Sequence, residues 1–312
     1  MTRSSRVLIP AAFWIGVAGA VVALWLSGQA GKAWSEMQGA SLGVMLIVVG
    51  VGMLLPIIHA VRWAIVMRAL GTTMPVMLAA DITVSSSLVN YASPGYLGAP
   101  AKAFLANRSA AAPYPKTLLS MAFEQGLDFL VLIVGSLVAV LLLGPGRLEG
   151  LVPDVSRNAQ LAIGIAGVLL VALLLAAGRG RIERVGTRIM DAFRSLGGTV
   201  DRPRVGVLTL LYWLAQVAVV AVSFIELDLP ADVMTVLVLA TIPLLVGQMV
   251  PLPGGVGARE AAIVALSGAT GASTTGLLGL AVLQRVLLVA ALPLSLGLVR
   301  LARAVRLTGG NA

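Results

Sequence analysis

The amino-acid sequence predicts an all-α polytopic membrane protein, with about six full spans and two re-entrant helical hairpins in an inverted repeat. The 312 residues are 59% hydrophobic and only 11% charged, whereas about a quarter of the residues of a soluble domain are charged. The apolar residues come in runs of about 20, the length that crosses a hydrocarbon core of about 30 Å. Two of the apolar regions are interrupted by proline and glycine, which predicts broken helices.

Nine apolar segments follow one another along the chain. They lie near residues 7–27, 41–66, 75–92, 117–143, 159–178, 205–225, 233–250, 260–268 and 276–300. The first is longer than the apolar region of a signal peptide, so we interpret it as a retained span. Segment 260–268 is too short to cross a membrane, and segment 75–92 carries too many polar residues, among them Asp81 and Asn90, for a lipid-facing helix.

The basic residues predict the topology, because cytoplasmic loops carry an excess of Lys and Arg. They gather at the N-terminus, at positions 62–68, 102–116 and 179–204, and from Arg300 onward. Both termini are therefore expected in the cytoplasm, with 179–204 as a basic cytoplasmic loop. We count the membrane crossings between these basic regions. The count requires that the segment between residues 68 and 116 enters the membrane from the cytoplasm and returns to it. The segment 233–272 must do the same from the outside.

Proline and glycine mark the tips of these two predicted hairpins. Glycine tolerates the dihedral angles of a tight reversal, and proline removes a backbone donor. Such backbone survives at membrane depth only where protein or a wet cavity satisfies it. The expected structural residues are Asn90, which would hydrogen-bond the broken backbone, with Pro94, Gly95 and Gly98 at the first tip and Pro251, Pro253, Gly254, Gly255 and Gly257 at the second.

The two tips also indicate an internal repeat within a single transmembrane domain, 1–312. Residues 94–99 match residues 253–258 at an offset of 159, and Gln125 meets Gln284 at the same offset. We interpret residues 1–146 and 159–306 as the two copies, each of which reads span, span, hairpin, span. Because each copy crosses the membrane an odd number of times, the second copy has the inverted orientation. Inverted repeats of this kind are found in many transporters.

The stretch "PLPGGVGAREAAIVAL", followed by a span containing "LQR", resembles the flippase-like transmembrane family. This family includes the membrane part of lysylphosphatidylglycerol synthases, and the resemblance covers essentially the whole chain. It implies a stand-alone member that moves a lipid between the leaflets of a bacterial-type inner membrane. The lipid would be an anionic phospholipid or a polyprenyl or isoprenoid-linked lipid. Only six residues follow Arg306, so no aminoacyl-transferase domain is expected and the chain should not make a lipid by itself.

The first hairpin departs from the pattern of this family. Tyr96, Ala99 and Lys102 stand where the family usually has Arg, Glu and Arg, and Gln125 stands where it has Arg. Glu124 and Asp128 are kept. A different lipid head group is one explanation of these replacements. A different balance of binding sites between the two halves is another.

Charged and polar residues near the breaks form the predicted substrate-binding set. Its members are Arg259, Glu260, Arg285, Lys102, Glu124, Asp128 and Gln284. A helix N-terminus followed by an arginine favours phosphate, which assigns Arg259 to the lipid. In the alternative interpretation, Arg259 and Glu260 form a structural ion pair. Arg285 is expected to meet either Glu260 or the lipid phosphate, or else to pair with Glu124 or Asp128.

Glu124 and Asp128 lie four residues apart and therefore on one helix face. They could relay a proton, or they could be fixed counter-ions for Arg259 and Arg285. Lys102 could bind a phosphate. For the single histidine, His59, a packed and hydrogen-bonded role is favoured over proton coupling, and Arg62 is interpreted only as a basic residue at the inner end of its span.

Lipid translocation is the leading function, and no enzymatic activity is expected. The sequence has no cysteine and no HExxH, Asp-x-Asp, Gly-x-Ser-x-Gly or ATP-binding motif, so no metal and no cofactor are expected. The alternatives are a non-transporting accessory subunit of lipid or envelope biosynthesis and an intramembrane transferase acting on lipid-linked substrates. The expected partners are membrane lipids with anionic head groups, not nucleic acid. A homo-oligomer and separate lipid-synthesis enzymes are also compatible with the sequence.

Overall fold

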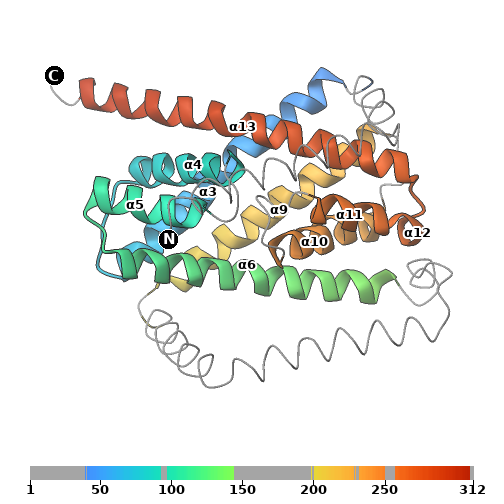
Figure 1. The fold of residues 1–312 in the computed structure, drawn as a ribbon, viewed down its shortest axis with the longest axis horizontal. Coiled ribbons are helices and arrows are strands. Elements are labelled where there is room, and N and C mark those ends of the chain that lie inside the picture. Colours follow the sequence, from blue (N-terminus) through green and yellow to red (C-terminus); the bar gives the residue numbers. More distant parts are fainter. Residues whose placement is uncertain are drawn as a thin grey trace, which may run out of the picture.

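The computed structural model describes residues 41–92, 97–143, 200–227, 232–249 and 257–309, together with Gly39, Gly198 and Leu229. Within these residues every regular element is a helix (Figure 1). The predicted fold class, an all-helical polytopic membrane protein, is confirmed. The predicted spans 7–27 and 159–178 and nearly all of the basic loop 179–204 lie outside the described residues.

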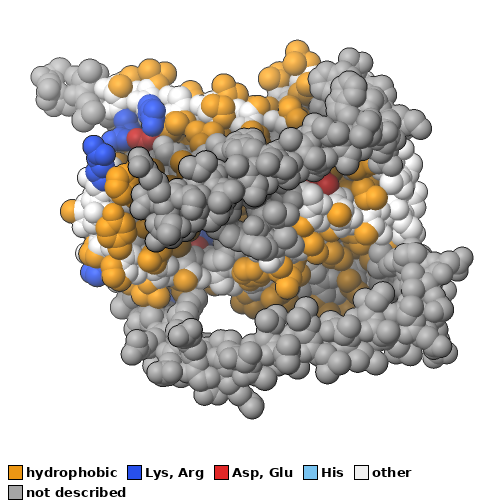
Figure 2. Space-filling model, viewed as in Figure 1, with side chains coloured by type: hydrophobic (Ala, Val, Ile, Leu, Met, Phe, Trp, Pro, Cys, Tyr) orange, Lys and Arg blue, Asp and Glu red, His pale blue; other side chains and the backbone are white. Residues whose placement is uncertain are grey.

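Four of the described helices are long and apolar enough to cross a membrane. They are α3 (Leu42–Ala69), α6 (Tyr114–Leu143), α9 (Arg202–Glu226) and α13 (Thr274–Gly309). Large apolar side chains are exposed along them, as lipid contact requires, and Figure 2 shows such side chains over much of one face. α13 extends nine residues beyond the predicted end of its span at residue 300, and this extension carries Arg303 and Arg306.

Two pairs of shorter helices occupy the positions of the predicted hairpins. α4 (Val76–Ala92) packs against α5 (Gly98–Ala110), and α10 (Val233–Met249) packs against α11 (Ala258–Ala265). A four-residue helix, α12 (Ser267–Thr270), follows α11. Neither region is one uninterrupted rod. The tip residues Pro94, Gly95, Pro251, Pro253, Gly254 and Gly255 lie outside the described residues.

The order of helices repeats along the chain. Arg202, Ala258 and Thr274, which begin α9, α11 and α13, each lie 160 positions after Leu42, Gly98 and Tyr114, which begin α3, α5 and α6. In Figure 1, α9 runs against the direction of α3, and α13 against that of α6. The α4–α5 pair lies towards one end of the bundle and the α10–α11 pair towards the other. This arrangement agrees with an inverted repeat, and the boundaries at 1–146 and 159–306 stay a prediction.

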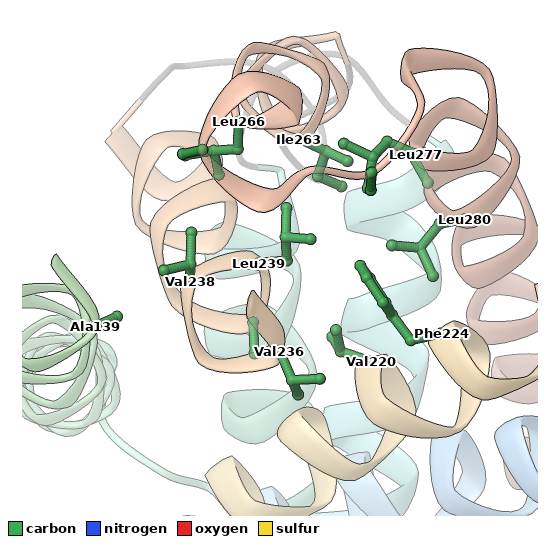
Figure 3. Packing of buried hydrophobic residues seen from close by; sticks show 14 of the residues in the cluster. Ala139, Val220, Phe224, Val236, Val238, Leu239, Ile263, Leu266, Leu277 and Leu280 are labelled. Atoms are coloured by element: carbon green, nitrogen blue, oxygen red, sulfur yellow. The ribbon is translucent and has the colours of Figure 1, made fainter. Parts of the chain in front are cut away.

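Packing of apolar side chains holds each helix pair in place. Leu239 of α10 lies between Ile263 of α11, Phe224 of α9 and Leu280 of α13 (Figure 3). A second cluster joins α3, α4 and α5 around Trp63, which is fully buried. Because lipid tails are as apolar as these side chains, close van der Waals packing is what favours association inside a membrane.

Glycine allows close approaches between neighbouring helices at two positions, Gly98 and Gly52. A Cβ atom on Gly98 would lie 2.7 Å from the Cβ atom of Asn90 and 3.0 Å from the carbonyl oxygen of Ser86. On Gly52 it would lie 2.9 Å from Cδ2 of Leu288 and 3.0 Å from the Cβ atom of Ala291. Gly98 therefore brings α5 against α4, and Gly52 brings α3 against α13.

Candidate functional site

A cavity of about 630 Å³ lies among the helices, with lining residues from α3, α4, α5, α6, α9, α10, α11 and α13. Asn90 and Gly98, on either side of the first break, both line it. So do Gln248 and Arg259, on either side of the second break. The two helix pairs, about 160 residues apart in sequence, therefore contribute to one cavity, which both polar and apolar side chains line.

A buried charge cluster forms one wall of this cavity. Arg62 of α3 donates to both carboxylate oxygens of Asp128, with N–O distances of 2.8 and 2.7 Å, and its Nε donates to Glu124 at 3.1 Å. Thr209 accepts a further bond from Arg62 at 3.2 Å, and Trp213 donates to Asp128 at 3.3 Å. The guanidinium therefore lies between two acids of α6, at a site that is almost closed to solvent, since Arg62 is 1% exposed.

The second oxygen of Glu124 faces two more basic groups. Nε2 of His59 lies 3.2 Å from it and Nζ of Lys102 lies 3.7 Å from it. Lys102 also lies over the ring of Trp63, 4.2 Å from the ring centroid, which is a cation–π distance. The His59 ring meets Tyr212 edge-on, with 6.1 Å between centroids. Glu124 thus connects α3, α5 and α6.

A second group of polar contacts lies where α11 meets α13. Arg259 donates to the Oε1 atom of Gln284 at 3.1 Å, and Glu260 pairs with Nε of Arg285 at 2.6 Å. The other oxygen of Glu260 accepts the backbone N–H of Gly257 at 2.7 Å. Gly257 has φ of +82°, a conformation that favours glycine. Glu260 therefore ties the start of α11 to α13.

The structure brings four members of the predicted substrate-binding set to the cavity wall. These are Lys102, Glu124, Asp128 and Arg259. The other three, Glu260, Gln284 and Arg285, are not among the described residues that line it. They lie next to Arg259, and the Gln284 side chain, 1% exposed, accepts its hydrogen bond.

The structure differs from the sequence-based expectations at the acids Glu124 and Asp128 and at Asn90. Glu124 and Asp128, expected to relay a proton or to pair with Arg259 and Arg285, pair instead with Arg62, together with Lys102 and His59 at Glu124. Of the alternatives for Arg285, the structure shows the contact with Glu260. Asn90, expected to hydrogen-bond the broken backbone, packs against Gly98, and its amide makes no hydrogen bond to a described residue.

Arg62, the central residue of the first cluster, is not in the predicted substrate-binding set. Its charge predicts only a position at the cytoplasmic end of a span, yet Arg62 lies within a 28-residue apolar helix. An ionisable residue inside a membrane span indicates function or a buried partner, and that signal could have identified Arg62. The neutral polar residues of the cavity were also missed, because isolated Ser, Tyr and Gln residues in apolar helices carry no motif.

The fold and the site together define a polytopic membrane protein with a partly polar cavity between two broken helix pairs. The family model described as "Lysylphosphatidylglycerol synthase TM region" matches residues 13–297, and the chain belongs to this family. The expected family is thereby confirmed, and it places the chain among membrane proteins involved in lipid handling. No curated protein and no solved structure matches the chain.

Proposed function

We propose that the protein translocates an anionic phospholipid, or a polyprenyl or isoprenoid-linked lipid, between membrane leaflets. The head group would enter the cavity while the tails stay in the surrounding lipid. One observation carries this proposal: residues beside both helix breaks line one cavity that also contains Lys102 and Arg259. The family, whose description names lysylphosphatidylglycerol synthases, supports a lipid as the substrate.

Arg259 is the residue that we assign to the phosphate. It is the second residue of α11, so it lies where the helix N-terminus favours an anion. Its guanidinium can donate two parallel hydrogen bonds to a phosphate. Gln284 holds one of its terminal nitrogens at 3.1 Å, and this contact would limit the orientations that the guanidinium adopts.

We further propose that one end of the bundle faces the cytoplasm of a bacterial-type inner membrane. In Figure 2, Lys and Arg side chains gather at the left end, over α4, α5 and the C-terminal part of α13. At this end Lys116 lies near Gly71, and Arg303 binds Asp81. An excess of Lys and Arg favours the cytoplasmic side, which would put both termini there.

Reconstitution tests the translocation. Purified protein is placed in liposomes with fluorescent lipids of different head groups, and the fraction of label reached by a reagent outside is followed in time. We expect wild type to speed the exchange of at least one anionic lipid. Arg259→Ala should lower that rate about 10- to 100-fold, as the loss of a charged hydrogen bond implies.

Arg108→Ala is the matched control, because Arg108 is an exposed arginine on α5 that does not line the cavity. Its rate should equal that of wild type. Equal exchange with and without protein, for every lipid tried, would refute translocation and favour an accessory subunit. Covalent change of a lipid-linked donor would identify an intramembrane transferase instead.

A further inference from the structure

The acids that line the cavity are already neutralised. Asp128 accepts two hydrogen bonds from Arg62 at 2.8 and 2.7 Å. Glu124 accepts one from Arg62 at 3.1 Å and lies 3.7 Å from Nζ of Lys102. A head group with an ammonium would have to displace one of these cations and leave it buried without a partner, which is strongly unfavourable. Among the described lining residues, therefore, no carboxylate is open to an amine.

The balance of charge in the same region favours an anion. Four cations, Arg62, Lys102, Arg259 and Arg285, stand against three acids, Glu124, Asp128 and Glu260, among the described residues of the two charge clusters. His59, whose side chain is 31% exposed, lines the cavity and would add positive charge on protonation. Arg259 donates a hydrogen bond to the amide oxygen of Gln284, and its guanidinium, which lines the cavity, can also donate to a phosphate.

The rest of the polar lining consists of neutral groups that both donate and accept hydrogen bonds. Its partly exposed members are Ser87, Asn90, Tyr212, Gln216 and Gln248, and Gln125 is exposed. Gln216 donates to the hydroxyl of Tyr212 at 3.3 Å, and Gln125 donates to Gln248 at 3.0 Å. The Asn90 amide makes no hydrogen bond to a described residue. Amides and hydroxyls in this arrangement suit a ligand with several hydroxyl groups, because a hydroxyl also donates and accepts.

We infer that the cavity selects a lipid whose phosphate carries a hydroxylated head group without an amine, such as a glycerol or a sugar. This inference rests on the proposed function, since it names the class of head group that the same cavity would take. The phosphate would meet Arg259. The hydroxyl groups would meet the neutral wall of α4 and α9, where Asn90 offers an amide that makes no bond to a described residue.

Binding measured by native mass spectrometry in detergent tests the selectivity apart from transport. The probes share their acyl chains and are phosphatidylglycerol, phosphatidylmethanol, phosphatidylethanolamine and lysylphosphatidylglycerol. Phosphatidylglycerol should bind at least about tenfold more tightly than either amine-bearing lipid. It should also bind about three- to tenfold more tightly than phosphatidylmethanol, which has the same charge without the hydroxyl groups. Equal binding of the amine-bearing lipids, or of phosphatidylmethanol, would overturn the inference.

Asn90→Asp tests the wall itself, because this nearly isosteric change adds an acid to the cavity. We expect it to abolish the preference for phosphatidylglycerol and to strengthen binding of the amine-bearing lipids. Ser109→Asp is the control, since Ser109 is an exposed residue of α5 that is not among the described lining residues. If Asn90→Asp does not fold, Gln216→Glu makes the same test. An unchanged preference in a folded variant would contradict the assignment.

The outcomes separate this inference from the proposed function. A preference for phosphatidylglycerol without translocation in liposomes would keep the head-group assignment and refute transport. Translocation together with equal binding of amine-bearing lipids would support transport and refute the head-group assignment. The last experiment is a competition with soluble glycerol phosphate. We expect glycerol phosphate to displace bound phosphatidylglycerol only in large excess. Displacement at equal concentration would mean a site for a soluble phosphate ester and would overturn the lipid assignment.

Discussion

Arg62 of α3 binds both carboxylate oxygens of Asp128 on α6, at 2.8 and 2.7 Å, and the two side chains are buried within the helical bundle. The same guanidinium also bonds Glu124 at 3.1 Å. This arrangement closes one wall of the cavity with charges that neutralise one another. The cation that we assign to the substrate is Arg259, which lies on α11 of the second helix pair and lines the same cavity.

Arg62→Met should destabilise the protein by about 3–5 kcal/mol, because it leaves two buried acids without their main cation. Thermal unfolding in detergent, followed by tryptophan fluorescence, measures the change. Arg68→Met is the control, since Arg68 is exposed in the last turn of the same helix and its loss should change stability by no more than about 0.5 kcal/mol. Equal unfolding temperatures for both variants would show that the Arg62 cluster is not stabilising.

Gly98→Ala should separate α5 from α4, because the added Cβ atom would lie 2.7 Å from the Cβ atom of Asn90 and 3.0 Å from a backbone oxygen. We expect a loss of about 1–3 kcal/mol, as for an overpacked core. Gly43→Ala is the matched control: it lies in a helix with nothing within 4 Å of the added atom and should be neutral or slightly stabilising. If chemical denaturation finds the two variants equally stable, this close contact is unimportant.

Glu260 and Arg285 should show an energetic coupling, since their side chains lie 2.6 Å apart at the junction of α11 and α13. A double-mutant cycle with Glu260→Gln and Arg285→Met should give about 0.5–3 kcal/mol. The exposed pair Asp201 and Arg204, at 3.1 Å, provides the comparison and should couple by less than about 1 kcal/mol. Additive effects at Glu260 and Arg285 would rule out a role for the pair in holding the second helix pair.

Asp81 of α4 binds Arg300 and Arg303 of α13, joining the first helix pair to the C-terminal end of the chain. Arg300 is 62% exposed, so salt should screen this contact. Asp81→Asn should lower stability by no more than about 1 kcal/mol at low salt, and the difference from wild type should shrink at 1 M salt. A loss that does not change with salt would indicate that Asp81 acts through packing instead.

Cysteine labelling tests whether the cavity is wet, because the natural chain has no cysteine. Single variants Asn90→Cys and Gln248→Cys, one beside each helix break, should both react with a membrane-impermeant maleimide. Ser136→Cys is the control, since Ser136 is a buried residue of α6 that is not among the described lining residues, and it should react far more slowly. If all three react equally slowly, water does not reach the cavity.

Most of the helices could be predicted from the sequence. The expected segments 41–66, 75–92, 117–143 and 233–250 differ by only a few residues from α3, α4, α6 and α10. Apolar runs reveal spans because the bilayer sets their length, and proline with glycine reveals breaks because these residues interrupt backbone hydrogen bonds. The family could also be predicted, since its motif lies in one continuous stretch that includes Arg259 and Glu260.

The pairing of charges could not be predicted in the same way. Arg62 and Asp128 are 66 residues apart, and Arg259 and Gln284 are 25 apart. The sequence allows several different pairings between its acidic and basic residues. Helix periodicity does not tell which faces of two helices meet, so it cannot choose among these pairings.

The sequence by itself determined that this chain is an all-helical membrane protein with two broken regions, and that its family handles lipid. Only the tertiary structure decided that Arg62 neutralises Asp128 and Glu124, and that Asn90 and Arg259 line one cavity. The physical reason is one of range: hydrophobic length and backbone breaks are local properties of the chain. The partner of a buried charge depends instead on how distant helices pack against one another.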